Sequence, residues 1–140
     1  MGTPLESVYQ RFLSKTSDYS FLKLEENGLL NQVLRDYLNS SITRFTNCRH
    51  TLDIDEDTSS FKEVLTNHEQ EILSVWMTFY HVGTKEKHVK VMEPFLSESD
   101  YTSRTKKLQL DSLMKLKESI QIEASNLQST YELYEHIEEM

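Results

Sequence analysis

The sequence predicts an all-α protein, a small bundle of about four to five helices with a long helix towards residue 140. Only 3 Gly and 2 Pro occur among 140 residues, which leaves few turn formers for a sandwich or barrel of short strands. Apolar residues recur at intervals of three and four in several separate segments, the spacing typical of amphipathic helices. The length fits a single domain over residues 1–140.

The first helix is expected to begin at Pro4 and to end near Lys15–Ser17. Thr3 can cap it, Pro4 suits its first position, and Glu6 completes a capping box. The segment 18–24 is expected to be a connector that places apolar side chains on the core.

The second helix is expected over about residues 25–48, because its apolar residues recur on one face from Leu30 to Phe45. Gly28 near its start weakens the first turn. A polar loop over about residues 49–60 follows.

Thr66 and Glu69 form a second capping box, which predicts the start of a third helix. Gly83 is a natural end for that helix. A short helix over about 85–93 and a break at Pro94 are expected next.

The last helix is expected from about Arg104 almost to residue 140. Its apolar residues step by three and four along one seam: Leu113, Leu116, Ile120, Ala124, Leu127, Tyr131 and Tyr134. A helix of some 30 residues spans about 45 Å, which outruns the other expected helices. Part of it must therefore project or rest on another subunit.

Charge is divided along this helix, which starts basic and ends acidic, against the preference of the helix dipole. Complementary patches of this kind suit contacts between subunits, and two solvated faces are the alternative. The residues assigned to a possible subunit interface are Arg104, Lys106, Lys107, Glu132 and Glu135. The basic run Lys85, Lys87 and Lys90 is either a solvated helix or a contact for DNA or an acidic partner.

Composition excludes several classes of protein. A net charge of −8 and a pI near 5.1 argue against a general nucleic-acid binder. The single Cys48 allows no internal disulfide and no cysteine-rich zinc site. No run approaches 18 apolar residues and no signal peptide is recognisable, so we expect no membrane association.

We find no complete catalytic or metal-binding pattern in the sequence. Asp53, Asp55 and Asp57 have calcium-loop spacing, but Thr58 and Val64 stand where that loop needs Gly and Glu. The five histidines are scattered, and Cys48 ends an apolar stripe, as a structural thiol does. We therefore expect no enzyme activity, no metal and no cofactor, and instead a protein that works by binding other protein subunits.

A set of ordered fragments gives a more specific expectation. They are Phe12-Leu13-x-Lys15, Asp18-Tyr19-x-Phe21-Leu22, Tyr37-Leu38-x-Ser40-Ser41-Ile42-x-x-Phe45-x-x-Cys48, Leu65-Thr66-x-x-Glu69-x-Glu71-Ile72-Leu73, Asp100-Tyr101-Thr102-Ser103 and Tyr131. Together, over about residues 12–134, they resemble the small neck proteins of tailed bacteriophages, the head-to-tail adaptors or connectors of long-tailed phages and prophages.

The resemblance implies a helical virion protein, assembled in the host cytoplasm, that joins identical copies into a dodecameric ring beneath the portal. A next neck or tail-completion protein would bind the opposite face, and DNA would pass the channel without sequence-specific contacts. Residues 129–140 are then the expected docking tail for the portal protein. The residues assigned to it are Tyr131, Leu133, Tyr134, Ile137 and Met140. The alternative is a small cytoplasmic helical regulator that binds one partner through the same helix.

Overall fold

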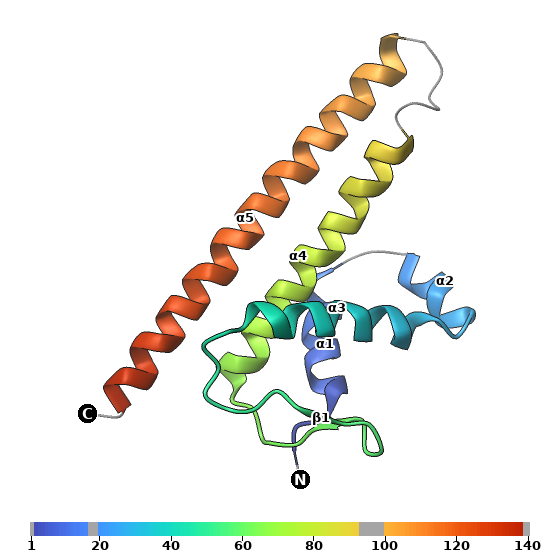
Figure 1. Cartoon of the computed structure of the whole chain (residues 1–140). Coiled ribbons are helices and arrows are strands. Elements are labelled where there is room, and N and C mark those ends of the chain that lie inside the picture. Colours follow the sequence, from blue (N-terminus) through green and yellow to red (C-terminus); the bar gives the residue numbers. More distant parts are fainter. Residues whose placement is uncertain (1, 17–19, 93–99, 139–140) are drawn as a thin grey trace.

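The architecture is a long pair of helices with three shorter helices packed against the lower half of one of them (Figure 1). A computed structural model describes the backbone of residues 2–16, 20–92 and 100–138, and the side chains of 2–16, 20–90 and 107–133. Its elements are α1 Leu5–Lys15, α2 Ser20–Glu26, α3 Leu30–Arg44, β1 Ile54–Asp55, β2 Ser60–Phe61, α4 Asn67–Met92 and α5 Asp100–Glu138. The prediction of a mainly helical protein with a long last helix is confirmed.

Helix α4 is the centre of the fold, because α1, α3 and α5 all pack against it. Its residues from 72 to 82 are buried almost all round, as expected for a helix with neighbours on several sides. The buried cluster around it contains Phe12 from α1, Leu38 from α3, and Ile120 and Ala124 from α5. The far part of the α4–α5 hairpin projects beyond the three short helices (Figure 1).

The predicted break at Gly83 is wrong, because α4 runs without interruption from Asn67 to Met92. Val82, Glu86 and Val89 continue the face that packs towards α5, and all three are buried. The buried Glu86 carboxylate pairs with Lys90 and Lys117, at 2.9 Å and 3.6 Å. Because the charged Glu86 takes a buried position in this face, the apolar periodicity is interrupted and does not indicate that the helix continues.

The second predicted helix, over 25–48, is shorter than expected. Gly28 has a φ of +72° and separates α2 from α3, which begins at Leu30 and ends at Arg44. The segment predicted as a connector contains α2, from Ser20; residues 17–19 lie outside the described structure.

The polar loop after α3 contains two short antiparallel strands that the sequence did not indicate. Ile54 of β1 pairs with Phe61 of β2, and the N-terminal residues are hydrogen-bonded to the same segment. Thr3 accepts the N–H of Phe61 at 2.8 Å through its carbonyl, and its hydroxyl accepts the N–H of Leu65 at 2.8 Å. Thr3 is therefore no helix cap, and the N-cap of α1 is Pro4.

Candidate interaction surface

Helix α5 buries one narrow stripe and leaves several large apolar side chains in solvent. Ile120, Ala124 and Tyr131 are buried towards α4, and Leu113 and Leu127 are partly buried beside them. The exposed fractions of the other large apolar side chains are 67% for Leu108, 47% for Met114, 48% for Leu116, 55% for Ile122 and 64% for Leu133. A helix of 39 residues that contacts a single long neighbour thus retains uncovered apolar surface.

Three of these side chains share one face. Leu108, Ile122 and Leu133 are separated by 14 and 11 residues, close to about four and about three whole turns at 3.6 residues per turn. Ile122 is two residues from Ile120, which places it roughly 200° around the helix from the buried stripe. We call Leu108, Ile122 and Leu133 the outer face of α5.

Tyr131, the first residue assigned to portal docking, is only 1% exposed. Its ring packs edge-on against Phe45 and His68, with centroids 5.3 Å and 5.5 Å away. Its hydroxyl donates to Glu69 Oε2 at 2.8 Å and accepts the backbone N–H of Arg49 at 3.0 Å. These contacts are all made inside its own chain.

The other docking residues divide into two groups. Leu133 is exposed, as a docking residue must be. The side chains of Tyr134 and Ile137 lie outside the described part of the chain, and so does Met140.

Two of the five residues assigned to a subunit interface have described side chains. Lys107 and Glu132 are both exposed, and 25 residues of helix place them about 38 Å apart at 1.5 Å per residue. The side chains of Arg104, Lys106 and Glu135 lie outside the described structure. The opposite charges therefore stand at opposite ends of one continuous helix.

Glu69 is the polar centre of the joint between α3, α4 and α5. The carboxylate is fully buried and completes the predicted capping box: it accepts the Thr66 N–H at 2.7 Å, and Thr66 Oγ1 accepts the Glu69 N–H at 3.1 Å. It also accepts hydrogen bonds from Cys48 Sγ at 3.2 Å, His50 Nδ1 at 2.7 Å and the Tyr131 hydroxyl. The sequence predicted the capping box, but it did not indicate that the same carboxylate accepts hydrogen bonds from three further donors.

The pKa values in this cluster follow from its burial. Burial would raise the pKa of Glu69, but the hydrogen bonds from Thr66, His50, Cys48 and Tyr131 together lower it below its ordinary value of 4.5. Burial and the neighbouring Glu69 carboxylate raise the pKa of Cys48 to about 12, so the thiol stays protonated at neutral pH. A nucleophilic cysteine needs the opposite shift, and the cluster is suited to structure.

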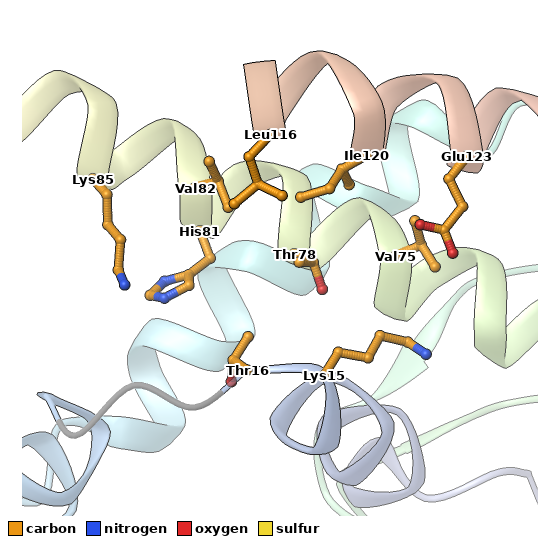
Figure 2. Close-up of a pocket in the computed structure, with 10 residues that line it drawn as sticks. All are labelled: Lys15, Thr16, Val75, Thr78, His81, Val82, Lys85, Leu116, Ile120 and Glu123. Carbon is orange, nitrogen blue, oxygen red and sulfur yellow. The ribbon is translucent and has the colours of Figure 1, made fainter. Parts of the chain in front are cut away.

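A cleft of about 410 Å³ lies where the end of α1 meets α4 and α5 (Figure 2). Leu116 and Ile120 of α5 point into it from one side, and Lys15 and Thr16 face them from the other. Lys15 is ion-paired with Glu71. Burial alone would raise the pKa of Glu71, but the positive charges of Lys15 and Arg11 outweigh burial and lower it. The α5 side of the cleft combines Leu116 and Ile120 with the carboxylate of Glu123, and Lys15 places a basic group on the α1 side.

Comparisons with protein-family models, with curated proteins and with solved structures find no match. Among the described residues, no group of three or more His, Cys, Asp or Glu side chains is arranged to hold a metal ion. In the same part of the chain, no helix combines the length and apolar content needed to cross a bilayer.

Proposed function

We propose that the chain is a structural subunit of a phage neck, a head-to-tail adaptor that assembles as a ring on the portal. The observation that carries the proposal is the outer face of α5, where Leu108, Ile122 and Leu133 stand in solvent opposite the buried stripe. The three side chains lie about 21 Å and about 17 Å apart at 1.5 Å per residue, with exposed Lys115, Ser119 and Asn126 between them, so they fit separate apolar anchors within a largely polar interface.

The proposal also rests on the resemblance, and residues from three of its fragments pack together. Cys48, Glu69 and Tyr131 come from three separate fragments that resemble adaptor proteins. All three meet in the hydrogen-bonded cluster around the Glu69 carboxylate. The fragments therefore belong to one joint that sets the direction in which α5 leaves the body.

The mechanism of such a subunit is assembly. Copies of the chain would form the ring under the portal protein, and the next neck or tail-completion protein would bind below it. Burial of a Leu or Ile side chain is worth about 1.5–3 kcal/mol, so the outer face can contribute substantially to each contact.

The experiment expresses the chain together with the portal protein encoded in the same genome and measures their association by native mass spectrometry and cryo-EM. We expect several copies on each portal. The variant Ile122→Ser/Leu133→Ser removes two outer-face side chains that are 55% and 64% exposed. It should weaken portal association or ring formation at least about tenfold, because each tenfold step corresponds to about 1.4 kcal/mol.

The matched control is Leu22→Ser/Leu29→Ser, which removes side chains of similar exposure, 59% and 47%, from the region of α2 and α3. It should assemble like the wild type. Deleting residues 129–140 is a poorer test, because it takes Tyr131 out of the core. A wild-type chain that does not bind the portal, or equal losses in both variants, would remove the proposal.

A further inference from the structure

The charge of this acidic chain is distributed very unevenly. Residues 83–117 hold 8 Lys and Arg against 5 Asp and Glu, a net charge of +3. The remaining residues hold 7 against 18, a net charge of −11. Helices α4 and α5 bring residues 83–92 and 100–117 side by side in the projecting part of the hairpin, which we call the hairpin end (Figure 1).

The hairpin end presents lysines and apolar side chains together. Lys90 and Lys117 are engaged with the buried Glu86 inside the hairpin. Lys87 and Lys107 are exposed, and so are Leu108 at 67% and Met114 at 47%. Exposed lysines and exposed apolar side chains on the same projecting part of the molecule suit the docking of an acidic protein.

The opposite end of the molecule has the complementary character. Residues 50–66 hold five acidic residues and one Lys, a net charge of −4. Asp53 and Asp57 are exposed, and Val64 is 65% exposed. We call residues 50–66 the acidic loop; in Figure 1 it lies at the foot of the body, far from the hairpin end.

The acidic loop has a defined shape. Its two strands pair Ile54 with Phe61, and Asp55 Oδ1 accepts the N–H of Asp57 at 3.0 Å. Hydrogen bonds from Phe61 and Leu65 to Thr3 fix the loop to the start of the chain. Glu56 is ion-paired with Arg35 of α3, so the exposed Asp53 and Asp57 are the carboxylates that the ordered loop displays.

We propose that the hairpin end of one copy docks on the acidic loop of the next copy. The proposal rests on the proposed function, since it names the subunit contact of that ring. Two different patches on each chain make a heterologous contact, which repeats from copy to copy and closes into a ring when the rotation allows. Nucleic acid is the less favoured partner, because the remainder of the chain carries −11 and repels a polyanion.

The test is a charge swap in the full-length chain, read by sedimentation velocity over a wide range of protein concentration. Lys87→Glu/Lys107→Glu changes the net charge of residues 83–117 from +3 to −1, and Asp53→Lys/Asp57→Lys changes that of the acidic loop from −4 to 0. All four side chains are exposed, so the folded state should be retained, which circular dichroism checks. We expect the wild type to self-associate, at least about tenfold more weakly at about 1 M salt, where the screening length falls to about 3 Å.

The hairpin variant alone should lose self-association because −1 then meets −4, and the loop variant should lose it because +3 then meets an uncharged loop. An equimolar mixture should recover association, because the unchanged hairpin end of one variant meets the unchanged acidic loop of the other. The proposed contact is overturned if the mixture associates no more strongly than either variant alone, or if the wild type stays monomeric at low salt.

Two further readouts separate the possible failures. If the hairpin reversal abolishes binding to a labelled DNA duplex but leaves self-association unchanged, the hairpin end is a nucleic-acid surface and the proposal is wrong. If the wild type binds the portal but the mixture shows no recovery, this contact fails while the adaptor function stands. Recovery without portal binding supports the contact and removes the adaptor function.

Discussion

The prediction that tests the joint between α5 and the body most directly is Tyr131→Phe. The substitution keeps the ring in place against Phe45 and removes only the buried hydroxyl. That hydroxyl donates to the Glu69 carboxylate at 2.8 Å and accepts the Arg49 N–H at 3.0 Å. One atom therefore connects the last helix to α4 and to the segment after α3.

The magnitude follows from these two bonds. A hydrogen bond to a charged group contributes about 1.5–3 kcal/mol, and a buried donor that loses its acceptor costs about 1–3 kcal/mol. Glu69 keeps its donors from Thr66, Cys48 and His50, so the loss at the carboxylate is partial. We expect the free energy of unfolding to fall by about 3 kcal/mol and Tm by about 10 °C for a chain of this size.

The assay is urea unfolding followed by circular dichroism, with Tyr80→Phe as the matched control. The Tyr80 hydroxyl accepts a hydrogen bond from Arg44 Nε at 2.8 Å at the surface, so its loss should cost less than about 1 kcal/mol. Equal stability of Tyr131→Phe and the wild type would refute the structural role of the hydroxyl. If Tyr131→Phe were as stable as the wild type but had lost portal binding, Tyr131 would be a docking residue, as the sequence predicted.

Three further predictions concern the backbone, pH and the thiol. Gly83→Ala should raise the free energy of unfolding by about 0.5–1 kcal/mol, because Gly83 is inside α4 and a Cβ there meets the Lys117 side chain no closer than 3.6 Å. Gly28→Ala, at a φ of +72°, should lower it by about 1–2 kcal/mol, and urea midpoints decide both signs. The pKa values of Glu69 and Glu71 in the folded chain are lowered, so the stability that these carboxylates contribute should be constant above the ordinary glutamate pKa of 4.5 and should be lost as they are protonated at lower pH. Glu71→Gln should make this fall shallower in unfolding curves taken at successive pH values. Iodoacetamide should alkylate Cys48 at pH 8 about a thousandfold more slowly in the folded chain than in urea, because the thiol pKa is about 12 in the folded chain and 9.0 ordinarily. Equal alkylation rates in the two states would contradict that pKa shift.

The sequence predicts the helices well wherever local pattern decides the outcome. The Thr66–Glu69 capping box starts α4 as expected, because both partners lie within one turn of each other. Thr3 failed as a cap for the opposite reason: its hydrogen-bond partners are Phe61 and Leu65, about 60 residues away. A pairing at that separation leaves no periodic signal near the helix that it displaces.

The candidate site was predictable only in outline. The excess of apolar residues on the last helix is visible in the sequence, and the exposure of Leu133 agrees with it. The burial of Tyr131 was not visible, because it depends on Phe45 and Glu69, which other helices bring to it. Heptad spacing shows that residues share a face, but packing decides whether that face meets the same chain or another one.

Tyr131 and Leu133 show that the two sides of α5 differ. Tyr131 is buried towards α4, whereas Leu133, about 200° further round the helix, is 64% exposed, just as Ile122 is exposed and Ile120 is buried. A helix turns 100° per residue, so one neighbouring helix covers only part of its circumference. The uncovered part holds Leu108, Ile122 and Leu133 among exposed polar residues such as Lys115, Ser119 and Asn126. The proposed subunit contact requires these three apolar side chains to be its anchors, and the Tyr131 hydroxyl fixes their direction relative to the body.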